Sequence, residues 1–349
     1  MILRIVTALL LCFWHLPAFA DEFLTAEDFF GGKYSGFNLV AASTITAKDV
    51  ADMGAMGARI ARYHLKTRRC QKCDYYLFPA KELQRFNQLL EWARLANIKL
   101  ILAFDPLPAR EDAELWDNKR LQDSIVKLWG LLATAYKDNP TVAGFDIMNE
   151  PVAPASLVVP WVDNDANQWP QLAQRIVSRI RSSGSPHIIF YEPSPLANPG
   201  AFKRILPLLD TNIVYSFHFY EPHLITHQGV HSLPNGVPYP GNVPGRGYYD
   251  KNRLRDIMQP VRNFSRKYRV PVQVGEFSCI RWAPDNSRDQ YLKDVLELFA
   301  EESWPWLYHS FREWQGWDAE LPANNRVSMT RASDTSTIVL IRQGLSNNK

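Results

Sequence analysis

The sequence predicts a single-domain α/β fold, a (β/α)8 TIM barrel, on three observations. Apolar, strand-like segments alternate with helix-like segments, which requires parallel strands joined by right-handed crossovers. Eight such units give roughly 41 residues each, a suitable length for a barrel unit with its loops. The main alternative is an open doubly wound sheet, but no Gly-rich GxGxxG turn follows an early strand.

Each predicted strand is a short apolar run bounded by turn-forming or polar residues. The eight strands are predicted at 34–41, 58–65, 98–106, 142–150, 187–193, 213–222, 270–277 and 305–311. Between them, apolar residues recur at three- and four-residue spacing, which predicts amphipathic helices. The predicted helices cover 80–97, 120–137, 171–183, 252–268 and 289–303. A proline inside 252–268 predicts a kink in that helix.

The first 20 residues are typical of a secretory signal peptide. Arg4 precedes an apolar run that ends in small residues before Asp21, so we expect cleavage after Ala20. The apolar run is shorter than the ~20 residues needed to span a bilayer. We therefore expect residues 21–349 to form one secreted or periplasmic domain with no membrane attachment after cleavage.

Composition excludes some classes of partner. The 39 basic and 36 acidic residues give a net charge of only +3, and the one dense basic run is 66–69. Nucleic acid is therefore not an expected partner. The 11 tryptophans indicate either a large aromatic core or a groove that stacks on flat ligands.

The cysteines and loop histidines do not predict a metal centre. In the motif "CQKC", Cys70 and Cys73 form either a local disulfide or two free thiols, and no further zinc ligands stand nearby. Cys279 is expected to be a buried free thiol. A Pro/Gly-rich stretch at 221–249 contains three histidines, which we interpret as exposed loop residues: His223, His227 and His231. We expect neither a metal nor a cofactor.

Polar residues stand where the predicted strands end, and in a barrel the carboxyl ends of the strands form the active site. These residues are Asn38, Arg62, His64, Asp105, Asn149, Glu150, Glu192, His218, Tyr220 and Glu276, followed by Trp314 and Trp317 after the last strand. We expect them to converge on one cleft. Arg59 precedes Arg62 by three residues and faces the opposite side of the strand, so we expect only Arg62 to point inward.

Two of these carboxylates suit glycoside hydrolysis, which needs one group to protonate the leaving oxygen and another to attack or to activate water. Glu150 and Glu276 are 126 residues apart, which matches the fourth and seventh strands. Arg62 and Tyr220 could keep Glu276 ionised. Glu192 is a rival carboxylate at a strand end.

Five motifs, "GARIARY", "GFDIMNEP", "FHFY", "VQVGEF" and "FREWQGWDAE", together resemble glycoside hydrolase family 5, the cellulase family of clan A. The resemblance covers the whole mature chain in the right order. It implies a (β/α)8 barrel that hydrolyses β-linked glycans with retention of configuration and without a cofactor.

The resemblance also implies roles for individual residues. Glu150 matches the general acid/base and Glu276 the nucleophile, while Arg62 matches the arginine that orients the nucleophile. Asn149 matches the partner of the sugar 2-hydroxyl. His218 and Tyr220 match a His-x-Tyr pair, and Trp314, or alternatively Trp317, matches the aromatic platform under the sugar. The chain departs from the family at Asp105, where a histidine is often found, which leaves the identity of the sugar open.

We therefore expect a monomeric, secreted or periplasmic retaining β-glycosidase that acts on internal bonds of a polysaccharide or oligosaccharide. A β-glucan, a β-mannan and an exopolysaccharide are the candidate substrates. Retention predicts carboxyl groups about 5 to 5.5 Å apart. Two alternatives remain: a non-catalytic glycan-binding or exopolysaccharide-export-associated barrel, and a transglycosylase that uses the same two glutamates. His64 could either line the site or pack in the core, and the sequence does not favour one of these positions over the other.

Overall fold

The structure is a computed structural model that describes residues 22–40, 44–70, 73, 75–105, 114–152, 168–230, 232–323 and 326–348. The predicted signal peptide and His231 lie outside these residues. For Asp105 the backbone is described and the side chain is not. No helix in the described ranges combines the length and the apolar character needed to cross a membrane.

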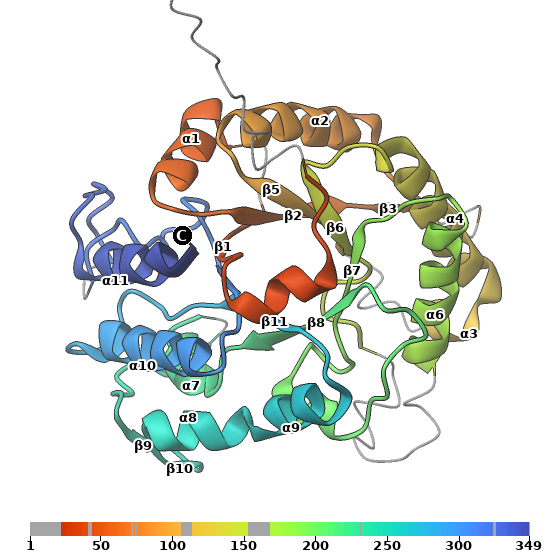
Figure 1. Ribbon diagram of the computed structural model, residues 1–349. Coiled ribbons are helices and arrows are strands. Elements are labelled where there is room, and N and C mark those ends of the chain that lie inside the picture. Colours follow the sequence, from red (N-terminus) through yellow and green to blue (C-terminus); the bar gives the residue numbers. More distant parts are fainter. Residues whose placement is uncertain are drawn as a thin grey trace, which may run out of the picture.

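Eight parallel strands close into a barrel, which confirms the predicted fold (Figure 1). Each strand pairs with the next barrel strand along the chain, and the last pairs with the first. The strands are β1 (Gly36–Leu39), β2 (Ile60–Lys66), β5 (Lys99–Asp105), β6 (Val142–Asp146), β7 (Ile188–Tyr191), β8 (Ile213–Phe219), β11 (Val272–Phe277) and β12 (Trp306–Tyr308).

All eight predicted strands are present, but the first, fourth, fifth, sixth and eighth are each three or four residues shorter than expected. The shortening of the fourth and the sixth bears on the site. The fourth was predicted to reach residue 150 and ends at Asp146, so Asn149 and Glu150 lie in the loop that follows. The sixth ends at Phe219, just before Tyr220. In the fourth and the sixth strand, the backbone leaves the hydrogen-bonded sheet just before the residues whose side chains lie in the site. Apolar periodicity alone does not reveal such an end.

Helices surround the barrel, and the five predicted ones are all found (Figure 1). These are α2 (Ala80–Leu95), α4 (Lys119–Tyr136), α6 (Gln168–Arg181), the pair α8 (Lys251–Ile257) and α9 (Gln259–Tyr268), and α10 (Ser287–Glu301). The predicted kink is a full break, since α9 begins anew with Pro260 in its first turn. Four further helices were not predicted from the sequence: α1 (Ala47–Ala55), α11 (Ser336–Leu345) and the short α3 (Glu114–Asp117) and α7 (His223–Thr226).

Two hydrophobic clusters form the core. The larger lies between the strands and the helices, where Ile125, Trp129 and Ala133 on one face of α4 are fully or almost fully buried. The smaller cluster fills the barrel itself, with Ile60 and Ile101 among its members. The short helix η2 (Ala26–Gly31) crosses the barrel (Figure 1) and adds Phe29 to this inner cluster.

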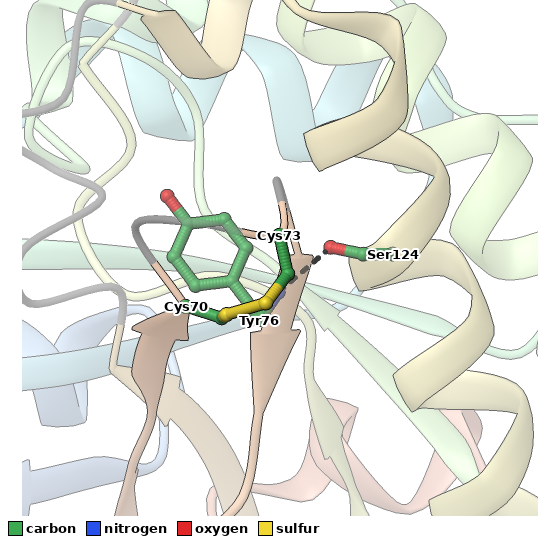
Figure 2. Close-up of a disulfide and its surroundings, with 4 residues drawn as sticks. All are labelled: Cys70, Cys73, Tyr76 and Ser124. Carbon is green, nitrogen blue, oxygen red and sulfur yellow. Dashed lines mark hydrogen bonds between the residues drawn. A yellow bond between two sulfur atoms is a disulfide. The ribbon is translucent and has the colours of Figure 1, made fainter.

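Two hairpins extend from the barrel. The hairpin of β3 (Arg68–Cys70) and β4 (Tyr75–Leu77) carries a disulfide between Cys70 and Cys73, which decides between the two alternatives for "CQKC" (Figure 2). The backbone N–H of Tyr76 donates to Oγ of Ser124 on α4 at 3.0 Å and ties the hairpin to the barrel. Cys279 is a buried free thiol, as expected. The second hairpin, β9 (Gly241–Val243) with β10 (Gly247–Tyr249), orders part of the stretch 221–249.

Two adjacent phenylalanines on η2 test the contribution of this inner plug. Phe29 is 1% exposed and packs on the rings of Phe190 and Tyr34, whereas Phe30 is 48% exposed. Phe29→Ala should lower the free energy of unfolding by about 3 to 5 kcal/mol, because it leaves a cavity in the barrel. Phe30→Ala, the matched control, should change it by about 0.5 kcal/mol. Equal effects in denaturant titrations would contradict the placement of η2.

Candidate active site

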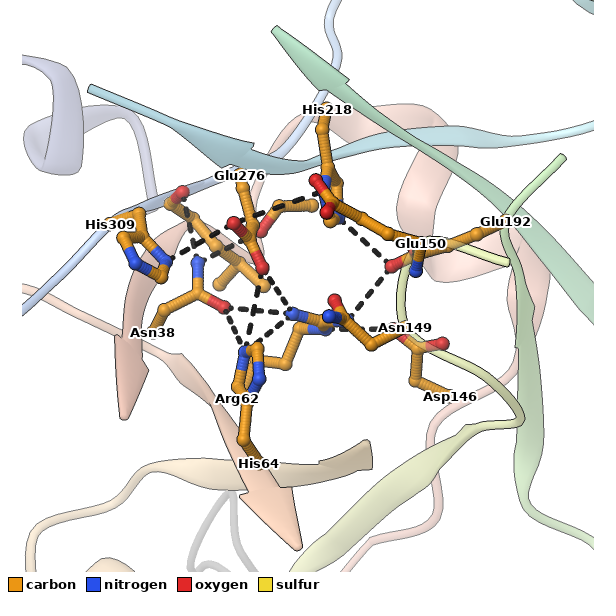
Figure 3. Close-up of polar contacts among 12 residues, drawn as sticks. Asn38, Arg62, His64, Asp146, Asn149, Glu150, Glu192, His218, Glu276 and His309 are labelled. Carbon is orange, nitrogen blue, oxygen red and sulfur yellow. Dashed lines mark hydrogen bonds and ion pairs between the residues drawn. The ribbon is translucent and has the colours of Figure 1, made fainter. Parts of the chain in front are cut away.

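Most of the predicted site residues lie together at the carboxyl ends of the strands, and Figure 3 shows Asn38, Arg62, His64, Asn149, Glu150, Glu192, His218 and Glu276. Around the buried guanidinium of Arg62 lie Asn38 from β1, His64 from β2, Asn149 and Glu150 after β6, His218 from β8 and Glu276 from β11. They adjoin a cleft of about 330 Å³. Its lining comprises Glu150, Leu196, Asn198, His218, Tyr220, Glu221, His223, His227, Val230, Glu276, His309 and Trp317.

Arg62 is the hub of the site, and its side chain is only 1% exposed. Its nitrogens donate to carboxylates of Asp146, Glu192 and Glu276 at 2.7, 2.8 and 2.8 Å. Burial alone would lower the pKa of Arg62, but these three carboxylates raise it. The inward orientation expected from the spacing of Arg59 and Arg62 is therefore present.

Arg62 also orients two amides. Its Nη1 donates to Oδ1 of Asn38 at 3.1 Å, and its Nη2 donates to Oδ1 of Asn149 at 2.9 Å. Asn38 in turn donates through Nδ2 to the carbonyl of Gly275 at 2.9 Å, directly before Glu276. The two asparagines therefore have fixed orientations, with their oxygens turned toward the guanidinium.

Glu276 is held on both carboxylate oxygens. Oε1 accepts from Arg62, and Oε2 accepts from the hydroxyl of Tyr220 at 2.9 Å. Burial would raise the pKa of Glu276, but the charges of nearby His218 and Arg62 hold it well below its ordinary value. Glu276 is therefore ionised at neutral pH, which is the state a nucleophile requires.

The backbone around Glu276 brings it against His218. Gly275 precedes it, and a Cβ at that position would lie 2.3 Å from Oγ of Ser216 and 3.1 Å from the His218 ring. The pairing of β11 with β8 shifts register between Val274 and Glu276. Only glycine permits this close approach, which explains the "VGEF" sequence.

Glu150 sits in a left-handed backbone conformation with φ 43°. Its N–H donates to Oε2 of Glu192 at 2.6 Å, and its carboxylate accepts from Nδ1 of His218 at 2.9 Å. Nε2 of His218 donates to Oε1 of Glu192, also at 2.9 Å. His218 thus bridges two carboxylates, which requires both of its nitrogens to carry protons.

The protonation of His218 follows from its neighbours. Burial would lower its pKa, but the charges of Glu192 and Glu276 and the hydrogen bonds to Glu150 and Glu192 raise it well above its ordinary value. The opposite holds for His64. Burial and the charge of Arg62 lower the pKa of His64 well below its ordinary value, so His64 is neutral.

The two glutamates face each other across the cleft at short range. One carboxylate oxygen of Glu150 and one of Glu276 lie within 4.8 Å of each other. Retaining glycosidases place their carboxyl groups about 5 to 5.5 Å apart, whereas inverting enzymes need about 6.5 to 9.5 Å to admit a water molecule. An oxygen pair within 4.8 Å is compatible with the shorter spacing of retaining enzymes.

Two buried acids, Glu192 and Asp146, accept hydrogen bonds from Arg62. Glu192, the rival candidate, is fully buried and does not line the cleft. His218 and Arg62 lower its pKa despite its burial. Asp146 on β6 was missed by sequence analysis, although a charged residue inside the apolar run "VAGFDIM" is a signal that could have identified it. Burial raises the pKa of Asp146 despite Arg62, and the charge of Glu192 raises it further.

Strand eight contributes a residue that sequence analysis also missed. His309 follows β12, lines the cleft and places Nδ1 3.2 Å from Oε2 of Glu276. Of the two tryptophans predicted here, Trp317 lines the cleft, while Trp314 is 36% exposed and packs edge-on against it. A polar residue at the end of "WLYHSF" was the available signal for His309.

The loop histidines are only partly as expected. His223 is exposed, but His227 is half-buried, stacks on His223 and packs against Tyr220 and Trp317. Both line the cleft. The helical turn α7 brings them to the site, and the Pro/Gly-rich composition of the stretch concealed that turn.

One group of described residues could bring three ligand atoms to a metal ion: Glu150, His218 and Glu276, with those atoms within 4.8 Å of one another. His218 fits this role poorly. A ligating histidine must offer a neutral nitrogen, and both nitrogens of His218 already face carboxylates. The absence of a metal and of a cofactor stays a prediction.

Comparison with known proteins shows which family this chain matches. The family model described as Cellulase (glycosyl hydrolase family 5) matches residues 25–315. Endoglucanase C of Acetivibrio thermocellus is 26% identical over 248 residues, or 63% of this chain and 69% of the relative. Cellodextrinase A of Ruminococcus flavefaciens is 20% identical over 266 residues, or 73% of this chain and 74% of the relative. The solved structure of the cellulose synthase subunit Z (CcsZ) from Clostridioides difficile is similar in fold, with a TM-score of 0.72, 18% identity, and coverage of 90% of this chain and 99% of that one.

The raised pKa of His218 predicts how stability depends on pH. Because folding raises this pKa, protonated His218 stabilises the fold; that stabilisation is complete below about pH 6.5, the pKa of an unfolded histidine, and is lost as pH rises through the folded-state value. The difference in unfolding free energy between wild type and His218→Gln should therefore shrink as the pH rises above about 6.5. Denaturant titrations at each pH measure it. A difference that stays constant would contradict the proton bridge.

Proposed function

The chain belongs to glycosyl hydrolase family 5, the cellulase family, and from that membership we propose a retaining β-glycoside hydrolase that cleaves internal bonds of a β-linked polysaccharide. The observation that carries the proposal is the pair of Glu150 and Glu276, whose oxygens approach within 4.8 Å. That distance supports attack by one glutamate on a sugar whose leaving oxygen the other protonates.

The proposed reaction has two steps. In the first, Glu276 attacks the anomeric carbon while Glu150, which must be protonated in the complex with substrate, gives its proton to the departing glycosidic oxygen, so a glycosyl ester forms and the leaving sugar departs as an alcohol. In the second, Glu150 takes a proton from a water molecule that attacks the same carbon and releases Glu276. The products are two shorter glycans, and the proton returns to Glu150.

The contacts of the two glutamates support a division of roles. Glu276 receives hydrogen bonds from Arg62 and Tyr220 on its two oxygens, and both favour the charged form. Glu150 is 18% exposed in its side chain against 7% for Glu276, and its charged partner is the titratable His218. Glu150 is thus the carboxyl group placed to exchange protons with solvent.

The lining of the cleft supports an uncharged polysaccharide. Its described residues include the acids Glu150, Glu221 and Glu276 but no lysine or arginine. A polyanionic glycan would meet these three acids, and the one cation in the described lining, His218, is already bonded to Glu150 and Glu192. Tyr220 and Trp317 offer aromatic faces of the kind that pack on sugar rings. We therefore place a β-glucan or a β-mannan, or a neutral exopolysaccharide, first among the substrates.

Removing either carboxylate tests the mechanism. Glu276→Gln should abolish release of reducing sugar from a panel of β-glucans, β-mannans and exopolysaccharides, because an amide cannot form the glycosyl ester. Glu150→Gln should slow cleavage by at least about 10²-fold. Glycosides with an activated phenol as leaving group should be affected less, since that group departs without a proton. Glu91→Gln, on an exposed residue of α2, is the control and should match the wild type.

The same assay separates this proposal from its two alternatives. Cleavage that survives Glu276→Gln would refute the nucleophile assignment. Binding to a glycan in the panel without any cleavage would identify a glycan-binding or export-associated barrel. Products longer than the substrate would identify a transglycosylase. Inversion of the anomeric configuration in the first-formed product, followed by NMR, would contradict retention.

Export is a further part of the proposal. We propose that residues 1–20 are removed and that the mature enzyme acts as a monomer outside the cytoplasm. The small residues before Asp21 support cleavage there. Expression of the full chain with its leader should yield an exported protein whose N-terminal sequence begins at Asp21. Retention of Met1 in the exported protein would contradict cleavage after Ala20. A mass in solution twice that of the chain would contradict the monomeric state.

A further inference from the structure

We propose that His309 selects the sugar at the nucleophile by accepting a hydrogen bond from its 6-hydroxyl group, so that the substrate is a polymer of hexoses with a free 6-hydroxyl. This inference rests on the proposed function and names the class of sugar for the same site. It excludes pentosans and polyuronates as preferred substrates.

His309 is held at the wall of the cleft. It follows β12, and its side chain is 13% exposed. Its ring packs edge-on against Trp317 and Tyr220, with centroids 5.0 and 6.4 Å apart. These two contacts fix the ring plane, so His309 presents a defined edge to a ligand in the cleft.

The two ring nitrogens of His309 have different surroundings. Nδ1 lies 3.2 Å from Oε2 of Glu276, at an angle that does not make a hydrogen bond, and no other described residue bonds it. Burial lowers the pKa of His309, more than the charge of Glu276 raises it, so the ring is neutral. The adjacent carboxylate favours the tautomer with the proton on Nδ1. Nε2 then carries the lone pair and accepts a hydrogen bond.

The position of His309 relative to Glu276 determines which hydroxyl it meets. Arg62 donates to Oε1 of Glu276 and to Asn149, so Asn149 lies on the Oε1 side. Tyr220 and His309 lie at Oε2. The two sides of the nucleophile therefore carry different groups.

An anomeric carbon in front of Glu276 has C2 on one side and the ring oxygen, followed by C5 and C6, on the other. If Asn149 contacts the 2-hydroxyl, as its adjacency to Glu150 favours, the opposite side of the ring faces Tyr220 and His309. The nearest donor on that side of a hexose is the 6-hydroxyl. His309 is then its acceptor.

This contact discriminates between classes of sugar. A pentose such as xylose has no C6 and leaves the lone pair of Nε2 without a donor, which costs binding in a site shaped for that hydrogen bond. A uronate places a carboxylate at C6, where it would face an acceptor nitrogen and the negative charge of Glu276. Of these three classes of sugar, a hexose with a free 6-hydroxyl is the one that supplies the donor.

A pair of substrates tests the contact on the unaltered enzyme. The substrates are an aryl β-glycoside of the hexose identified by the glycan panel and its counterpart that lacks the 6-hydroxyl in the unit bearing the aryl group. The wild type should favour the hydroxylated substrate in kcat/KM by roughly tenfold. A preference below twofold overturns the inference without any variant, and so does a wild type that cleaves only xylan or a polyuronate.

Variants at position 309 then assign the preference to the side chain. His309→Phe keeps an aromatic ring without nitrogens and should reduce the tenfold preference to less than about twofold, while cleavage of the deoxy substrate persists. His309→Gln offers a carbonyl oxygen and should restore part of the preference. If His309→Phe turns over both substrates with the wild-type ratio, His309 is not the acceptor. A wild type inactive on every glycan refutes the proposed function instead, and the two failures are thereby distinguished.

Discussion

The site depends on the burial of one positive charge. Arg62 stands on β2 with its guanidinium almost wholly removed from solvent, and it is stabilised there because Asp146, Glu192 and Glu276 surround it. Those three acids come from β6, from the end of β7 and from β11. A buried ion group is stable only when its charges and hydrogen bonds are matched. The strand ends must therefore keep their relative positions, and the geometry of Glu276 follows from that constraint.

The two glutamates have different chemistry because their surroundings differ. Glu276 is fixed by Arg62 and Tyr220, neither of which gives up its proton readily at neutral pH. Glu150 has His218 as its partner, and His218 is itself shared with the buried Glu192. One carboxylate is thus locked in its charged form, while the other belongs to a chain of groups that can pass a proton. The same residue type is thus held in two different charge environments, which supports the different roles proposed for the two glutamates.

The sequence predicts the barrel well because apolar periodicity and strand-helix alternation are local signals. It predicts the residues at the strand ends for the same reason, since Asn149, Glu150 and Glu276 interrupt apolar runs. It misses Asp146 and His309, although each is a polar residue within or beside an apolar run, because neither stands at the predicted end of its strand. Their importance arises from partners distant in the chain: Arg62 for Asp146 and Glu276 for His309. The sequence predicts a kink where the structure has a break before α9, because a proline shows that a helix is disturbed but does not show whether it bends or ends.

Glu150 has a left-handed backbone conformation, which lowers the stability of the folded state. A non-glycine residue at φ 43° is destabilised by about 1 kcal/mol relative to glycine, which enters this region freely. Selection for thermodynamic stability alone would favour glycine at this position, whereas the proposed acid/base role of Glu150 requires a glutamate. The position is therefore a point of conflict between folding and activity. Laboratory evolution for heat resistance without an activity screen would be expected to lose this glutamate early, and a family member that no longer acts on glycans would be free to relax at the same place.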